Sequence, residues 1–277
     1  GHLCKAKDAY GDSYYYRGNV TNNYVKFAGF YWRIVRFNGD STVRVIYDGT
    51  SAHANGDSSS DRLIGTSAFN NNSNDNAYVG YMYGTIGAST YAATHANTHD
   101  STIKTYIDNW YKNNIYGKSY VQYLSDNIFC NDRSLGVYGD KGYGTETTRY
   151  HWYGFEISTS NLKCPQQNDA FTVNDTINGN GALTYPVGLL SIDEIVLAGG
   201  GGGTSNEGYY LHTGNEWISL TPSGFNSYIS FRYVSNSGRA MDNTGGTNNK
   251  GVRPVINLKA NALNAGTGTA DDPYRIS

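Results

Sequence analysis

Residues 209–258 read YYLHTGNEWISLTPSGFNSYISFRYVSNSGRAMDNTGGTNNKGVRPVINL, and their pattern decides the fold that we expect. Apolar residues recur through the stretch from Leu211 to Leu258, with Asn, Ser, Tyr, Gly, His and Arg between them. The apolar positions can hold a sheet. The others resemble a recognition surface, where Tyr supplies rigid contact area and Ser, Gly and Asn supply adaptable hydrogen bonds. We therefore expect a scaffold that presents such a surface.

If the apolar positions face inward, the polar and aromatic positions between them face a ligand. The alternative is that they are solvated strand and loop residues without a partner. The candidate ligand-binding residues are Tyr209, Tyr210, His212, Asn215, Glu216, Trp217, Ser219, Ser223, Asn226, Tyr228, Ser230, Arg232, Tyr233, Asn236, Arg239 and Asn243.

The composition predicts a folded chain rich in strands. Of 277 residues, 16% are charged and 14% aromatic, whereas disordered chains are poor in aromatic residues. Few apolar residues recur at helical spacing, so the core is expected to come mostly from strands. No internal repeat or linker divides the chain, which favours a single domain over residues 1–277.

Charge and hydropathy exclude two classes of partner. The net charge is −2 and no basic stripe is visible, which disfavours nucleic-acid binding. No apolar run approaches the roughly 18 residues that span a bilayer, so this segment is not expected to insert into a membrane. The excess of Tyr, Asn, Gly, Ser and Thr is typical of an extracellular, cell-surface or phage-particle protein. Gly1-His2 resembles a tag remnant, and residues 1–12 are expected to be an N-terminal tail.

The chain has three cysteines, Cys4, Cys130 and Cys164, at no zinc-binding spacing. Cys130 and Cys164 occur in similar loop contexts, and we predict that they form a disulfide. Closing that loop would stabilise the fold by roughly 3–4 kcal/mol in the chain-entropy model. The alternative is two buried free thiols. Cys4 is then unpaired or joined to something upstream.

Local patterns place a meander of strands near the start of the chain. Residues 14–17, 24–27, 30–37 and 43–47 are expected to be strands, with Asn38-Gly39 as a tight turn. Within residues 30–37, Trp32 and Ile34 alternate with Arg33, Val35 and Phe37, which is the period of two expected for a strand.

Two helices are predicted. One helix is expected over residues 101–114, because one of its faces would carry Ile103, Tyr106, Ile107, Trp110 and Tyr111.

Asp100 is the expected N-cap of that helix. A shorter helix over residues 191–197 begins with a capping box of Ser191 and Glu194. We interpret Asp193 and Glu194 as helix-start carboxylates rather than catalytic groups. Residues 199–203 are five glycines and are expected to form a flexible loop.

Catalytic and metal-binding patterns are weak. His95 and His99 are spaced for one helix face but precede the helix, so no metal site is expected there. Loop Asp and Asn oxygens could bind a structural Ca²⁺, yet no twelve-residue ligand loop occurs, and no cofactor is predicted. A carbohydrate-active enzyme would need paired carboxylates, for which the candidates are Asp132, Asp169, Glu146 and Glu156.

Several strings resemble a family of secreted or phage-borne proteins from gut bacteria. They are residues 16–25, 31–36, 100–114, 124–134 and 183–199. The closing GVRPVINL, residues 251–258, resembles the end of C-type-lectin-fold domains. These include the variable proteins diversified by retroelements and the formylglycine-generating-enzyme group.

The resemblance implies an α+β, C-type lectin-like fold with a twisted antiparallel sheet, about two helices and long loops. It also implies that the variable, ligand-facing residues lie within residues 209–258. The chain lacks a Glu-Pro-Asn or Gln-Pro-Asp motif and a C-terminal cysteine pair. Calcium-dependent sugar binding and formylglycine chemistry are therefore not expected.

The main hypothesis is thus a non-enzymatic module that binds a protein or glycan on another cell surface. The alternatives are a carbohydrate-active enzyme with two loop carboxylates facing each other in a cleft, and a structural adhesin or pilus domain.

Overall fold

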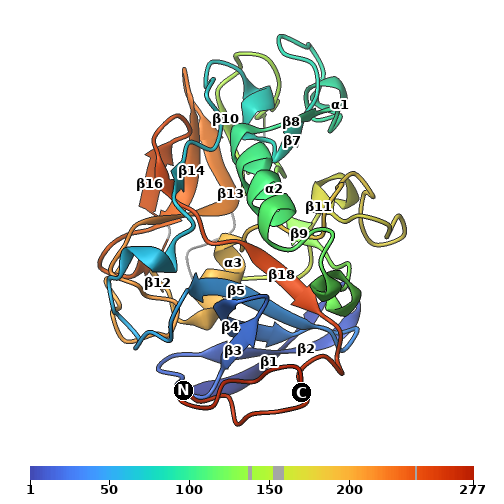
Figure 1. The fold of residues 1–277 in the computed structure, drawn as a ribbon. Coiled ribbons are helices and arrows are strands. Elements are labelled where there is room, and N and C mark those ends of the chain that lie inside the picture. The colour runs from blue at the N-terminus through green and yellow to red at the C-terminus, as the bar shows by residue number, and fades with distance from the viewer. Residues whose placement is uncertain (137–138, 152–158, 241) are drawn as a thin grey trace.

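The fold is a mixed α+β arrangement of two large sheets with helices between and beside them (Figure 1). The structure is a computed structural model, and it describes every residue except 137–138, 152–158 and 241. Within the described residues there are three α-helices and two six-stranded sheets. No described helix has the length and apolar character needed to cross a membrane.

The first sheet contains the predicted meander and lies at the end of the molecule where both termini are found (Figure 1). Its strand order is β1-β2-β4-β5-β18, with β3 paired to β4, and its pairs are antiparallel. Residues 1–12 are not a tail, because most of them form β1 and the start of β2. The strands are β1 His2–Asp8, β2 Gly11–Arg17, β3 Tyr24–Phe27, β4 Phe30–Phe37, β5 Val43–Gly49 and β18 Val255–Leu258.

The second sheet is built largely from residues 209–258. Its order is β16-β14-β13-β17-β6, with β10 paired to β13. The β13–β17 pair is parallel and the other pairs are antiparallel. Because β18 belongs to the first sheet, residues 209–258 connect the two sheets. The strands are β6 Thr66–Ser67, β10 Thr148–Arg149, β13 Trp217–Phe225, β14 Ile229–Val234, β16 Asp242–Gly245 and β17 Lys250–Gly251.

Short elements complete the fold. The glycine run is not a free loop as predicted, because Gly201–Gly202 pairs in parallel with Arg239–Ala240. A Cβ at Gly200 would lie 2.9 Å from that of Ala240, so glycine allows this close approach. The two-residue strands are β7 Met82–Tyr83, β8 His99–Asp100, β9 Phe129–Cys130, β11 Ala170–Phe171, β12 Gly201–Gly202 and β15 Arg239–Ala240. The 3₁₀ turns are η1 Ser60–Arg62, η2 Asn76–Val79, η3 Ser119–Tyr123 and η4 Gln167–Asp169.

The two predicted helices are α2, Thr102–Asn114, and α3, Ile192–Ala198; α1, Tyr91–Thr94, is a single turn. The predicted cap of α2 was wrong by one residue. Ser101 caps the helix, since its Oγ accepts a hydrogen bond from the Lys104 amide at 3.2 Å, whereas Asp100 pairs with the Lys104 ammonium. The capping box of α3 is confirmed.

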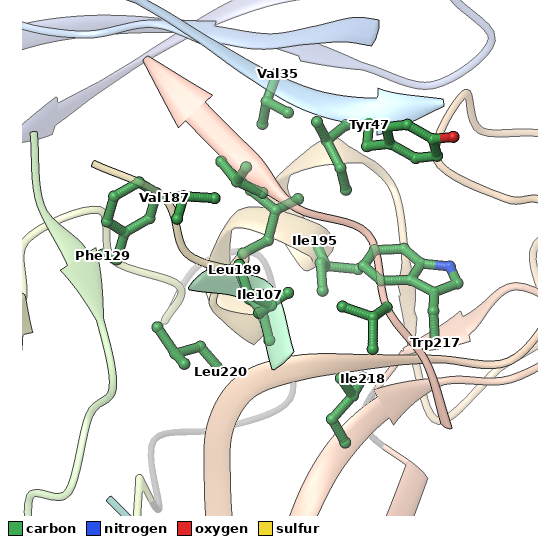
Figure 2. Close-up of a cluster of buried hydrophobic side chains, with 14 of the residues drawn as sticks. Val35, Tyr47, Ile107, Phe129, Val187, Leu189, Ile195, Trp217, Ile218 and Leu220 are labelled. Atoms are coloured by element: carbon green, nitrogen blue, oxygen red, sulfur yellow. The ribbon is translucent and has the colours of Figure 1, made fainter. Parts of the chain in front are cut away.

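One cluster of buried apolar side chains extends across both sheets and the helices. Figure 2 shows Val35 and Tyr47 of the first sheet on one side of it, and Trp217, Ile218 and Leu220 of the second on the other. Ile195 of α3 lies among them. Helix α3 therefore fills the space between the sheets, and all seven of its residues are buried.

The strand predicted over residues 30–37 is confirmed as β4. Trp32, Arg33, Ile34 and Val35 are all buried, because both faces of β4 are covered. Arg33 is fully buried, and its guanidinium donates to the side chain of Asn23 at 2.8 Å. It also lies 3.9 Å from the Tyr24 ring centroid. A buried arginine with such partners satisfies its donors without reaching solvent.

The predicted disulfide between Cys130 and Cys164 is confirmed. It connects β9 to the loop before η4. Cys4 has a free thiol and lies on β1, half-buried.

Candidate functional site

The predicted ligand-binding residues fall into three classes of exposure. Asn226, Tyr228, Asn236, Arg239 and Asn243 are exposed. Partly exposed are Asn215, Glu216, Ser230 and Tyr233. The remainder are buried, namely Tyr209, Tyr210, His212, Trp217, Ser219, Ser223 and Arg232. The buried residues lie outside any surface that a ligand can touch in this structure.

Tyr209 and Tyr210 are both 0% exposed and belong to the core. Burial raises the pKa of both phenols above the ordinary value of 10. His212 is also structural. Its Nε2 lies 2.9 Å from the carbonyl oxygen of Asn236, and its Nδ1 lies 3.2 Å from that of Glu207. The start of residues 209–258 therefore anchors the sheet instead of facing a ligand.

Two buried serines connect β13 to β14. Ser219 Oγ donates to the carbonyl oxygen of Arg232 at 2.7 Å, and Ser223 Oγ lies 2.7 Å from Ser230 Oγ. The Arg232 side chain is only 5% exposed. These residues lie on strands, as the sequence pattern predicts. Their side chains point toward the interior of the molecule instead of toward a ligand.

The exposed residues gather first at one end of the second sheet, which we call the tip. It comprises the turn at residues 226–228 between β13 and β14, the loop at 71–74 and the loop at 247–249. Tyr228 is 57% exposed there. Ile229 donates its amide to the Ser73 carbonyl at 2.9 Å and accepts at its own carbonyl from Gly246, also at 2.9 Å. These bonds hold the three loops together.

The tip is rich in amide side chains. The exposed side chains around Tyr228 are those of Asn71, Asn72, Asn74, Asn226, Ser227, Thr247, Asn248 and Asn249. Amide and hydroxyl groups both donate and accept hydrogen bonds. The tip therefore surrounds one large exposed aromatic ring with groups of both kinds.

From the tip the chain enters a shallow depression of about 310 Å³, which we call the groove. It is lined by Asn215, Glu216 and Asn236 of the predicted set, together with Asn249 and Lys250. Asn249 belongs to both the 247–249 loop and the lining of the groove, so the tip and the groove adjoin. Asn215 also has a structural role, since its Nδ2 donates to the Ser58 carbonyl at 3.2 Å.

A charged pair and an aromatic ring meet beside the groove. The Lys250 ammonium pairs with the Glu216 carboxylate, and it lies 4.4 Å from the centroid of the Tyr233 ring. A cation at this distance from an aromatic ring is attracted by the ring quadrupole. The pair neutralises its own charge, so the groove offers polar groups without a strong net charge.

The other exposed residues lie apart from this face. Arg239 is on β15, paired with Gly201. Asn243 is on the edge strand β16, opposite Arg232. The structure therefore does not bring all of the predicted residues together.

The sequence reasoning did not select Asn249, Lys250 or the amides of residues 71–74. The signal was present in the strings NNNSN at residues 70–74 and GGTNNK at 245–250, which are polar and turn-like. What the sequence could not show is that hydrogen bonds of Ile229 join these two loops at the tip.

The candidate catalytic carboxylates of the loops differ in their surroundings. Asp169 is fully buried and accepts from Arg133 Nε at 2.7 Å, which makes it structural. Glu146 is exposed beside Lys141. Asp132 lies in a cavity near His151, whereas Glu156 lies outside the described residues.

Within the part of the chain that the structure describes, no group of three or more His, Cys, Asp or Glu side chains is arranged to hold a metal ion. His95 is buried, with Nε2 lying 2.8 Å from the Gly142 carbonyl oxygen. No family model, curated protein or solved structure matches this chain. Any functional argument therefore rests on the geometry of its own residues.

Proposed function

We propose that the chain is an extracellular module of C-type lectin-like fold that binds a protein or glycan ligand through the tip and the groove. The observation that carries the proposal is the composition of this face. An exposed tyrosine surrounded by Asn, Ser and Thr side chains lies in the turn between two strands whose residues are mostly buried. Binding surfaces combine rigid aromatic anchors with adaptable polar groups in this way.

The scaffold supports this function because the face depends little on the core. The frame of residues 209–258 is made by buried side chains such as Trp217, Leu220 and Phe231. Side chains at the tip can change without opening a cavity, since they pack against few neighbours. The disulfide is compatible with an extracellular location.

The test is binding of labelled protein to a glycan array and to an array of bacterial surface proteins. We expect at least one specific interaction, and we expect Tyr228→Ala combined with Asn248→Ala to weaken it about tenfold or more, because central aromatic residues dominate interface energies. The matched control is Tyr14→Ala, which removes a 41% exposed tyrosine from the first sheet.

Both variants should keep the melting temperature of the wild type. If the tip variant binds as well as the control does, the ligand face has been assigned to the wrong part of the molecule.

A further inference from the structure

A second site lies outside residues 209–258. A cavity of about 480 Å³ opens beside the Cys130–Cys164 disulfide and the first turn of α3. Its volume is within the range of roughly 300–1,000 Å³ found for small-molecule sites. Its described lining residues include two carboxylates, an imidazole, an ammonium and an amide, whereas apolar atoms supply the larger share of the lining surface.

The centre of the lining is an acid–histidine–acid cluster, which we define as Asp132, His151 and Asp193. His151 Nε2 lies 2.5 Å from Oδ2 of Asp193 and 3.7 Å from Oδ2 of Asp132. All three residues are less than a tenth exposed. Two carboxylates from distant parts of the chain therefore converge on one ring nitrogen at the edge of a cavity.

The charges of the cluster depend on one another. Burial alone would lower the pKa of His151, but the hydrogen bond with Asp193 and the charges of both carboxylates raise it above 6.5. Burial raises the pKa of Asp132, with the nearby imidazole and the hydrogen bonds from Ser134 opposing it. The raised pKa favours the protonated ring of His151, which offsets one carboxylate, while Lys163 at the rim offsets the other. With the ring protonated, the described lining is close to neutral.

The carboxylates are held in fixed positions. Oδ1 of Asp132 accepts hydrogen bonds from the amide and the hydroxyl of Ser134. Oδ1 of Asp193 accepts from the Asn161 amide at 3.0 Å. The His151 backbone has φ +46°, a left-handed conformation that is uncommon for this residue, and its amide donates to the Ser134 carbonyl.

One acceptor in the cluster is left open. Oδ2 of Asp132 is 3.7 Å from the nearest histidine nitrogen, beyond hydrogen-bond distance. It has no other hydrogen-bond partner among the residues that the structure describes. Asp132 lines the cavity, so a hydrogen-bond donor of a bound molecule can reach this oxygen.

The chemistry of the lining selects the class of ligand. A small anion would meet the two carboxylates, and a cation would meet the imidazolium and Lys163. Pro165 and the disulfide are among the groups that supply apolar surface, against which the C–H groups of a ligand can pack. Hydroxyl groups suit the site, because each can donate to Asp132 and accept from the Lys163 ammonium or the Asn161 amide.

We propose that this cavity binds a small neutral polyhydroxylated molecule of monosaccharide size, with Asp132 Oδ2 accepting a hydrogen bond from a ligand hydroxyl. This site is separate from the tip and the groove, and it does not depend on their proposed function.

The test is saturation-transfer NMR of the wild-type protein with D-glucose, D-galactose, D-mannose and N-acetyl-D-glucosamine, each at millimolar concentration. We expect saturation transfer to at least one sugar. Asp132→Asn keeps the shape of the side chain but removes its charge, so it should weaken that binding about tenfold. Asp12→Asn, an exposed carboxylate of the first sheet, is the matched control and should leave binding unchanged.

A second variant, Lys163→Ala, removes an exposed side chain at the rim and should reduce binding several-fold with the fold intact. If Asp132→Asn does not fold, sugar binding by Lys163→Ala tests the proposal in its place. The proposal is overturned if none of the four sugars receives saturation, or if the variants bind like the control. It is also overturned if methylguanidinium or sulfate binds more tightly than the sugars. Tyr228→Ala should not affect this binding, which separates the site from the tip.

Discussion

Nε of Arg44 in β5 lies 2.6 Å from Oε1 of Glu194 in α3, and both side chains are almost completely buried. Arg36 of β4 shares the same carboxylate oxygen, at 3.1 Å. Burial lowers the pKa of Arg44 to about 10, although the charge of Glu194 opposes this. The helix between the sheets is therefore attached to the first sheet by charge as well as by apolar packing.

We predict that Glu194→Gln destabilises the protein by about 3–5 kcal/mol, because the substitution leaves the buried guanidinium of Arg44 without its ion-pair partner. Arg36 keeps Asp8, whose Oδ2 lies 2.7 Å from its Nη1. Urea denaturation followed by tryptophan fluorescence measures the loss. Asp12→Asn is the control, since its pair with Lys5 is exposed and solvent-exposed pairs contribute little to stability. A loss for Glu194→Gln as small as that of the control would mean that the buried pair is not stabilising.

The disulfide gives a second prediction. Cys130 and Cys164 are 34 residues apart, so replacing both with serine should cost about 3–4 kcal/mol through the added freedom of the unfolded chain. The melting temperature with and without reductant measures the same effect in the wild type. Cys4→Ser is the control and should change the melting temperature little. An insensitivity of the wild type to full reduction would contradict the prediction.

The sequence predicted those parts of the fold that depend on neighbouring residues in the chain. Strands β2 to β5 of the first sheet, the capping box of α3 and the disulfide were predicted from short patterns and were found, whereas β1 was expected to be a tail. The burial of Arg33 was not predicted, because the cover over β4 comes from segments distant in sequence. For the same reason Glu194 was interpreted only as a helix-start residue, since Arg36 and Arg44 are about 150 residues away in the chain.

The candidate site shows the same limit. The polar and aromatic pattern of residues 209–258 predicted strands with one exposed face, but β13 is buried on both faces, and Tyr228 is exposed in the turn that follows it. Tyr209 and Tyr210 are of the residue type that is common in binding surfaces, yet both are fully buried. Tyrosine is amphipathic, so its identity alone does not distinguish a ligand contact from a core position.

A third prediction concerns Gly188, whose amide and carbonyl both pair with Val255. A Cβ at this position would lie 2.5 Å from the Phe129 ring. Gly188→Ala should therefore destabilise the protein by about 1–3 kcal/mol through overpacking. In Gly208→Ala, the control, the nearest atom is Asn206 Oδ1 at 3.4 Å, and a small effect is expected. Equal unfolding midpoints for the two variants would show that the core at Phe129 can relax.

The last prediction concerns pH and the loop after β5. His53 Nδ1 lies 2.8 Å from Asp57, and its Nε2 lies 2.9 Å from Asp61. Burial alone would lower the pKa of His53, but its hydrogen bonds to the two carboxylates raise it above 6.5. Burial alone would raise the pKa of Asp61, but hydrogen bonds from His53 and Thr50 lower it to about 2.

The pKa shifts of His53 and Asp61 define the pH range in which their interaction stabilises the fold. A histidine whose pKa is raised on folding contributes stability below about 6.5, and loses it as the pH rises through the folded value. An aspartate whose pKa is lowered contributes stability above 3.8, and loses it as the pH falls toward about 2. The interaction of His53 with Asp61 should therefore stabilise the fold most between about pH 4 and 6.5.

Asp61→Asn should consequently lower the melting temperature most at about pH 5, and less at about pH 3 and pH 9. Asp271→Asn, an exposed aspartate in the C-terminal turn, is the control and should show no such maximum. Melting curves of both variants and the wild type at the three pH values provide the comparison. A deficit for Asp61→Asn that stays constant from acid to alkaline pH would mean that Asp61 acts through its hydrogen bonds to Thr50, at 2.8 and 2.9 Å, rather than through the charge of His53.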